Sequence, residues 1–225
     1  MTHTCGSQNV DVDAVALGIV KIFPTLDLFE QRLSLEVYRL LSGGQPVARA
    51  VLAERLQVSI ETVDRILDSW PGVFSNSARR IVGYWGLSIA AAYTSPHQLM
   101  IDGRRLSAWC AWDTLFLPSL LGKPAEVESR SPGLAGAVKL TVTPTGVKHL
   151  EPKDAHLSFV LPNTTDVQTD FVNTFCHFVH FFPSRQAGDA WAAQHSGTFI
   201  LSVAEAHAIA LLKNRAQYGG AMAVG

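Results

Sequence analysis

The spacing of apolar residues changes near residue 90, and this change constrains the fold more than any other feature of the chain. Before residue 90, apolar residues recur at helical spacing, which predicts helices over 26–41, 49–56 and 59–70. After it, short β-rich runs dominate and helical segments are few. Because strands and helices do not alternate regularly, we predict an α+β fold with an N-terminal domain over 1–90 and a second domain over 91–225.

The N-terminal segment has the outline of a winged helix. Two glycines after Ser42 end the first helix, and Ser59 is a suitable N-cap for the third. A short extended stretch containing Tyr84 and Trp85 follows the helices. Three helices followed by a β element predict a helical, winged-helix-like domain.

The charge of the third helix argues against binding to nucleic acid. This helix would contact DNA in a winged helix, yet Glu61, Asp64 and Asp68 outnumber Arg65 on it. Phosphates normally supply most of the non-specific affinity and would repel such a helix. The whole chain has a formal net charge of −1. We therefore expect no nucleic-acid partner, and interpret the domain as a structural cover or a partner surface.

The second part of the chain predicts a mixed or antiparallel β-sheet with a few helices. Asp102-Gly103 is a tight hairpin signal, and Val138 begins an alternating, half-buried strand. A last helix begins at Ser202, whose capping box Glu205 completes, and runs towards Tyr218. The remaining predictions are strands over 157–161, 175–182 and 198–203, a helix over 186–194, and a frayed tail over 219–225.

Composition and cysteine usage indicate a soluble cytoplasmic protein. Asp11 and Asp13 precede the first apolar stretch, where a secretory leader would carry basic residues. No apolar run reaches the roughly 18 residues that suggest a membrane span. Three cysteines, Cys5, Cys110 and Cys176, cannot form a disulfide framework. We expect free thiols, no membrane contact, and for Cys5 an incidental place in a flexible N-terminal segment.

Cys110 and Asp113 are the first candidates for chemistry. Three residues apart on a helix, they would share one face. The flanking tryptophans would desolvate the carboxyl and raise its pKa, as a general acid requires. The alternative is that Asp113 caps a helix or pairs with Arg104 or Arg105.

Cys176 lies in an aromatic run that is typical of a strand. Cys176, Phe178, His180 and Phe182 would face the same side of that strand. A lone cysteine in such a run is usually a small core residue. A zinc site formed by Cys110, Cys176 and His180 is weakly indicated, because closely spaced ligand pairs are absent.

The two cysteine segments together resemble one enzyme family. Residues 105–115, Arg-Leu-Ser-Ala-Trp-Cys-Ala-Trp-Asp-Thr-Leu, resemble the R-L-x-A-W-C-A-x-D-T-L segment of the bacterial organomercurial lyases (alkylmercury lyases). Residues 175–182 resemble the family's second cysteine segment. The resemblance runs from about residue 26 to residue 212 and includes weaker matches at 44–63, 140–142, 160–162 and 202–206. Some family members have a further cysteine where this chain has residues 128–131, which contain none.

The resemblance implies a reaction and a role for each residue. Cys110 and Cys176 would be the thiols that bind mercury, which suits a soft metal. Asp113 would be the proton shuttle and an optional further mercury ligand. The reaction implied is protonolysis of a carbon–mercury bond, as in mercuric resistance and detoxification, without an organic cofactor. Mercuric reductase or small cytosolic thiols would accept the Hg(II). The alternative is a winged-helix, thiol-based mercury or metal sensor that binds DNA.

Overall fold

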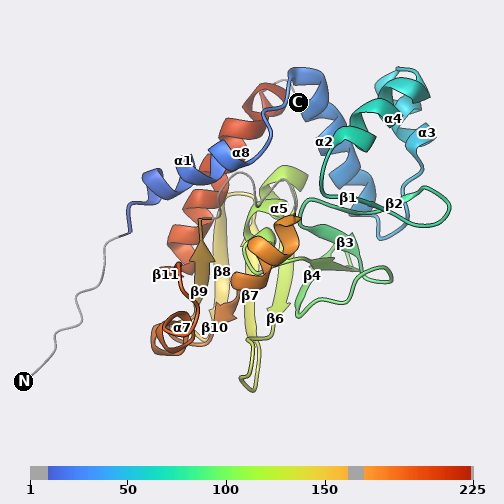
Figure 1. Cartoon of the computed structure of the whole chain (residues 1–225). Coiled ribbons are helices and arrows are strands. Elements are labelled where there is room, and N and C mark those ends of the chain that lie inside the picture. The colour runs from blue at the N-terminus through green and yellow to red at the C-terminus, as the bar shows by residue number, and fades with distance from the viewer. Residues whose placement is uncertain (1–9, 162–169, 224–225) are drawn as a thin grey trace, which may run out of the picture.

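The computed structural model describes residues 10–161 and 170–223. Its N-terminal helices run along the top of the view, and antiparallel sheets with further helices lie below and beside them (Figure 1). This arrangement confirms the predicted α+β class. Within the described residues, no helix is long and apolar enough to cross a membrane.

Within the described residues four helices precede the first strand, and a side-chain hydrogen bond caps the N-terminus of three of them. Asp27 and Glu30 form a capping box at the start of the second helix, and Ser59 caps the fourth as predicted. The first helix was not predicted, although Asp11 accepts a hydrogen bond from the backbone of Ala14 at its start. The helices are α1 (Val12–Ile22), α2 (Leu28–Leu41), α3 (Arg49–Leu56) and α4 (Ile60–Ser69).

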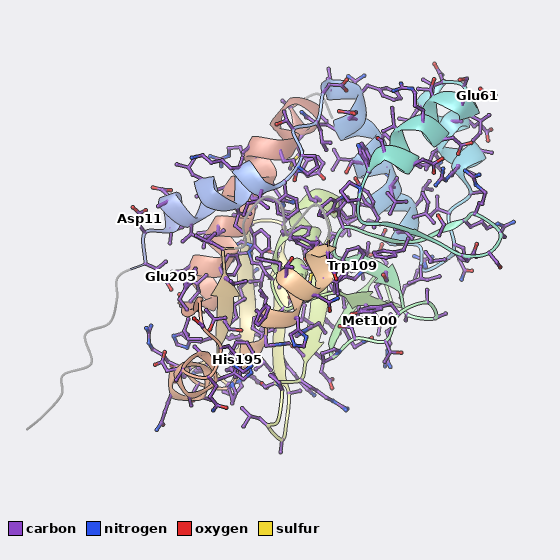
Figure 2. All side chains as sticks on the ribbon, in the orientation of Figure 1. Asp11, Glu61, Met100, Trp109, His195 and Glu205 are labelled. Atoms are coloured by element: carbon purple, nitrogen blue, oxygen red, sulfur yellow. The ribbon has the colours of Figure 1, made fainter. Side chains whose placement is uncertain are left out.

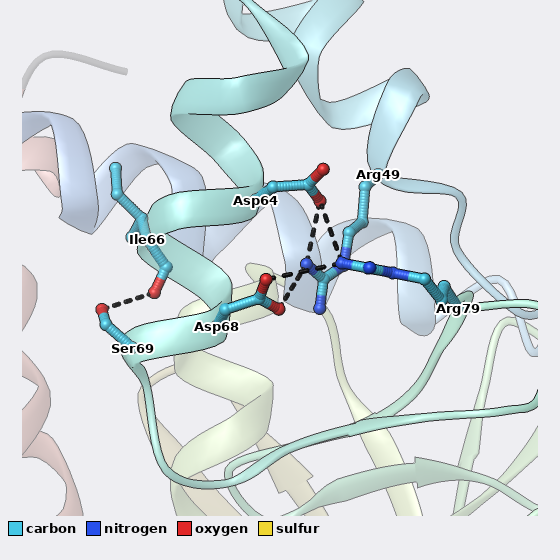
Figure 3. Close-up of polar contacts among 6 residues, drawn as sticks. All are labelled: Arg49, Asp64, Ile66, Asp68, Ser69 and Arg79. Atoms are coloured by element: carbon cyan, nitrogen blue, oxygen red, sulfur yellow. Dashed lines mark hydrogen bonds and ion pairs between the residues drawn. The ribbon is translucent and has the colours of Figure 1, made fainter.

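An ionic network ties α3 to α4 and to the turn that follows the first strand (Figure 3). The Arg49 guanidinium lies 2.9 Å from Asp64 and 2.6 Å from Asp68, and Arg79 lies 3.4 Å from Asp68. The Arg49 side chain is only 10% exposed, whereas that of Asp68 is 54% exposed. Two of the acidic groups on the third predicted helix are therefore paired with arginines.

The larger sheet has eight antiparallel strands in the order β1-β2-β3-β5-β4-β6-β7-β8. Strand β3 pairs with β5, so the sheet continues across residue 90. The predicted hairpin at Asp102-Gly103 joins β4 to β5, and the strand predicted at Val138 is β7. The strands are β1 (Val73–Ser75), β2 (Ile81–Tyr84), β3 (Leu87–Ile89), β4 (His97–Ile101), β5 (Arg104–Ala108), β6 (Ala125–Ser129), β7 (Val138–Thr143) and β8 (Gly146–Glu151).

A smaller sheet and further helices complete the described part of the fold. The small sheet has the order β10-β9-β11, and α8 packs against α1, α2 and α5. Residues 219–222, predicted as a frayed tail, are helical and belong to α8. These elements are β9 (His156–Val160), β10 (Phe181–Phe182), β11 (Thr198–Ser202), α5 (Asp113–Leu121), α7 (Arg185–Ala192) and α8 (Val203–Met222).

Candidate active site

Cys110 lies in a turn between β5 and α5, so its predicted place on a helix was wrong. The helix begins only at Asp113, because backbone groups just before it bond to other segments. The Trp109 N–H donates to the Gly86 carbonyl, and the Ala111 N–H donates to the Val179 carbonyl. The predicted proximity nevertheless holds, because the Asp113 carboxylate accepts the backbone N–H of Cys110 at 2.7 Å.

Cys176 begins a short 3₁₀ helix, η1 (Cys176–Phe178), so the strand predicted over 175–182 was wrong as well. Only Phe181 and Phe182 form a strand there. The Phe178 N–H donates to the Phe175 carbonyl and the Val179 N–H to the Cys176 carbonyl, which closes the turn. Apolar and aromatic residues favour a strand locally, but these bonds to nearby carbonyls replace the strand pattern.

The turn before α5 and the turn of η1 bring three reactive side chains together. One ligand atom from each of Cys110, Asp113 and Cys176 lies within 4.8 Å of the others. All three residues are buried, with exposures of 0%, 1% and 2% respectively. In the described part of the chain, this is the only group of three or more histidine, cysteine or acidic side chains with such geometry. We call it the thiol–carboxyl cluster.

Burial dominates the electrostatics of the cluster. It raises the pKa of Asp113 to about 6, although hydrogen bonds from Cys110 oppose the shift. It also raises the pKa of both thiols, well above its usual range for Cys110. The Cys110 thiol hydrogen-bonds to Cys176 and interacts with Asp113. The carboxyl can therefore exchange a proton near neutral pH. It lies beside a thiol whose raised pKa disfavours the loss of its proton without a nearby base.

Gly86 permits the close approach of Asp113 and was missed in the sequence. It lies in the turn between β2 and β3 with a φ of +90°. A Cβ atom at this position would lie 2.5 Å from Asp113 Oδ1 and 2.6 Å from its Cγ. Glycine is therefore needed both for the backbone conformation and for the space of the carboxyl.

Lys213 is a buried amine that interacts electrostatically with Asp113, and it was also missed. It lies on α8, is 1% exposed, and its Nζ sits 4.1 Å from the centre of the Phe116 ring on α5. Burial lowers its pKa to about 7, while the charge of Asp113 opposes the shift. The next residue, Asn214, fixes α8 to α5 by donating to the Phe116 carbonyl at 2.9 Å. No local sequence pattern distinguishes this lysine from the usual exposed lysines of a helix.

Tyr93 is a partly exposed side chain whose phenol interacts electrostatically with the cluster. It lies in the loop between β3 and β4 and is 38% exposed. Burial, and then the charges of Cys176, Asp113 and Cys110, raise the pKa of its phenol. A tyrosine in a loop gave no signal in the sequence.

The alternatives raised by the sequence do not describe this site. Within the described ranges, no ion pair joins Asp113 to Arg104 or Arg105, and both arginines are exposed. His180 is not part of the cluster, so the zinc site predicted with Cys110 and Cys176 is not formed by these three residues. Cys5 lies outside the described residues, as does Pro162 of the weaker resemblance at 160–162.

Figure 2 labels Trp109, which comes directly before Cys110 in the sequence. Trp109 lies near the middle of this view, and its side chain is buried. Glu61, by contrast, lies at the outer end of the helical part. The Trp109 indole donates to Ser88 Oγ at 2.8 Å, and the ring of Phe74 packs against its edge with the ring centres 5.0 Å apart.

Comparisons with known proteins give a consistent result. The family model described as alkylmercury lyase matches residues 91–212. An alkylmercury lyase of Pseudomonas putida is 38% identical over 168 residues, which are 75% of this chain and 76% of that protein. An alkylmercury lyase of Staphylococcus epidermidis is 36% identical over 168 residues, which are 75% of this chain and 74% of that one.

A solved structure supports the fold. The crystal structure of the mercury-bound form of MerB2 aligns with a TM-score of 0.69 at 21% identity, covering 93% of this chain and 98% of that chain. This likeness concerns the fold, whereas the family follows from the sequence matches. The chain belongs to the alkylmercury lyase family.

Proposed function

We propose that this protein is an organomercurial lyase whose catalytic residues are Cys110, Asp113 and Cys176. The observation that carries this proposal is the thiol–carboxyl cluster, in which two sulfurs and a carboxylate meet within 4.8 Å in a buried site. Thiolates are the preferred protein ligands of soft metals, so two of them suit a mercury centre. The organomercurial is the substrate, and Hg(II) remains on Cys110 and Cys176 as the product.

The reaction balances with the groups present in the cluster. The substrate has the form R–Hg–X, where X is a small thiolate. One cysteine sulfur displaces X, which leaves with the thiol proton as HX. The second sulfur binds mercury and passes its proton to Asp113. Asp113 donates that proton to the mercury-bound carbon as the Hg–C electron pair moves onto carbon, and RH leaves.

The pKa of Asp113, raised by burial to about 6, supports its role as the proton carrier. A carboxyl with that pKa accepts and releases a proton near neutral pH with little cost in either direction. The thiols have raised pKa values, so a nearby base is needed to generate a thiolate. A positioned acid–base group of this kind contributes roughly 10²–10⁴ in rate.

We further propose a division of labour along the chain. Residues 91–225 contain the three catalytic side chains, and residues 1–90 form a winged-helix-like cover that contributes Gly86 against Asp113. The order of α2, α3 and α4 followed by the β1–β2 hairpin supports this description. A cytoplasmic location fits a product that is passed to mercuric reductase or to small cytosolic thiols.

Release of hydrocarbon tests the proposed function. Purified protein is incubated with phenylmercury and excess thiol, and benzene is followed by gas chromatography. We expect many turnovers for the wild type and none for Cys110→Ala or Cys176→Ala, because the remaining thiol cannot bind mercury through two sulfurs. Stoichiometric mercury binding by the wild type without benzene would refute the proposal, and so would near-normal turnover by either variant.

A further inference from the structure

The turn that carries Cys176 is held by two side chains that take no part in the proposed chemistry. Within the part of the chain that the structure describes, Ser158 and His180 are the residues whose side chains hydrogen-bond to the backbone of residues 176–180. The first lies on β9, and the second immediately precedes β10. Both lie outside the thiol–carboxyl cluster.

Ser158 links β9 to the end of the turn at several atoms. Its hydroxyl donates to the Phe178 carbonyl at 2.7 Å and accepts the backbone N–H of His180 at 3.0 Å. Its own backbone N–H donates to the His180 carbonyl at 2.9 Å. Ser158 is fully buried, so no water replaces these bonds if the hydroxyl is removed.

His180 closes the turn from the other side. Its Nε2 lies 2.8 Å from the His177 carbonyl, and because a carbonyl only accepts, Nε2 carries the proton. The ring is packed between His97 and Trp191, with ring centres 5.7 Å and 5.4 Å away. The imidazole is therefore fixed in place as a donor to the residue that follows Cys176.

The residue between these contacts joins the two thiol segments. The Val179 carbonyl accepts the backbone N–H of Ala111, the residue after Cys110, at 3.1 Å. Residues 178 and 180 are thus hydrogen-bonded to Ser158, and residue 179 between them is hydrogen-bonded to Ala111. A shift of this segment would move Cys176 relative to Cys110.

We propose that Ser158 and His180 are positioning residues that hold the Cys176 turn so that its sulfur meets that of Cys110. Their effect on turnover rests on the proposed lyase function, whereas their effect on the spacing of the two thiols does not. The spacing can be measured with phenylarsine oxide, a trivalent arsenical that binds two neighbouring thiols with release of water.

The chain offers a matched control for each residue. Ser131 Oγ donates to the Phe181 carbonyl at 2.6 Å, so Ser131→Ala removes a similar buried bond one residue beyond the turn. His156 Nδ1 lies 2.8 Å from the Asp154 carbonyl at the start of β9, so His156→Phe removes a similar imidazole donor to a carbonyl outside residues 176–180. The test variants are Ser158→Ala and His180→Phe, and Ser158→Thr retains the hydroxyl.

We expect Ser158→Ala and His180→Phe each to weaken phenylarsine oxide binding, measured in competition with a dithiol, by on the order of tenfold, because small misplacements of reacting groups cost up to ~10²-fold. The kcat for benzene release should fall in parallel, with partial rescue in Ser158→Thr. In the control variants, arsenical affinity and kcat should stay within about twofold of the wild-type values. Comparing variants of matched melting temperature separates positioning from general stability.

Wild-type arsenical affinity in both Ser158→Ala and His180→Phe would overturn the inference, as would an equal loss in the two controls. If Ser158→Ala does not fold, His180→Phe and Ser158→Thr still decide between these results. Weaker arsenical binding in the test variants of a protein that never releases benzene would uphold the positioning role and refute the lyase function.

Discussion

Asp113 and Asp68 are carboxyl groups of one chain in opposite surroundings. Asp113 is 1% exposed, and burial raises its pKa to about 6. Asp68 lies on the outside of α4, and its hydrogen bond with Arg49 lowers its pKa. The first carboxyl has thiols as its close partners and a buried lysine as a counter-charge, whereas the second is paired with arginines.

The two surroundings suit different roles, proton transfer for the buried carboxyl and structural support for the paired one. A paired surface carboxylate stays ionised and helps modestly to hold α3 against α4. A buried and poorly compensated carboxyl costs stability, but it can take up and release a proton at neutral pH. Strained or costly groups of this kind concentrate at functional sites. Neutralising the buried carboxyl should therefore raise the free energy of unfolding, whereas neutralising the paired surface carboxylate should lower it.

The largest effect is expected from crowding Asp113. Gly86→Ala places a Cβ atom 2.5 Å from Asp113 Oδ1 at a φ of +90°, and we expect it to destabilise the fold by roughly 2–5 kcal/mol. Benzene release should be lost with it. Gly103→Ala is the control, because its φ is +73° with nothing within 4 Å of the new Cβ, and it should cost only about 1–2 kcal/mol. Equal losses of unfolding free energy in the two variants, measured by urea denaturation, would contradict the proposed crowding of Asp113.

Removing the charge of Asp113 should stabilise the protein. The unfolded carboxyl titrates near 3.8 and the folded one near 6. Between these values the folded state holds more protons, so stability falls as pH rises through this window. Asp113→Asn should abolish that fall and gain as much as roughly 3 kcal/mol at pH 7. A variant that is less stable than the wild type at pH 7, or keeps the same pH profile in thermal melts, would show that burial of the charge is not costly.

The smallest effect is expected at Asp68, with the opposite sign. Its depressed pKa contributes stability that is present above the ordinary value of 3.8 and is lost as pH falls through the folded value. Asp68→Asn should therefore lose a little stability at pH 7, less at high salt, and leave benzene release unchanged. Urea denaturation at low and high salt measures this. A change in turnover would mean that the network around Arg49 reaches the active site.

Local signals in the sequence predicted much of the fold. The end signals of α2, α4 and α8 and the turn at Asp102-Gly103 depend on neighbouring residues, and the structure has these elements near the predicted positions. The surroundings of the two cysteines do not depend on neighbours alone. Bonds from Ala111 to Val179 and from Ser158 to Phe178 override the helix predicted at Cys110 and the strand predicted at Cys176.

The same distinction applies to the candidate site. The family resemblance identified Cys110, Asp113 and Cys176 because each lies in a recognisable segment. Gly86, Lys213 and Tyr93 come from three other segments, and their relation to Asp113 exists only after folding. The proposed catalytic residues were therefore named from the sequence, whereas the residues that surround them required the structure.

A single-turnover experiment with Asp113→Asn tests the central claim most directly. The variant is mixed with one equivalent of phenylmercury, and retained mercury and released benzene are measured in the same samples over time. We expect mercury to be retained on Cys110 and Cys176 as in the wild type, while benzene forms roughly 10²–10⁴-fold more slowly. Release of benzene at the wild-type rate would contradict the account, because the proton would then come from a group other than Asp113.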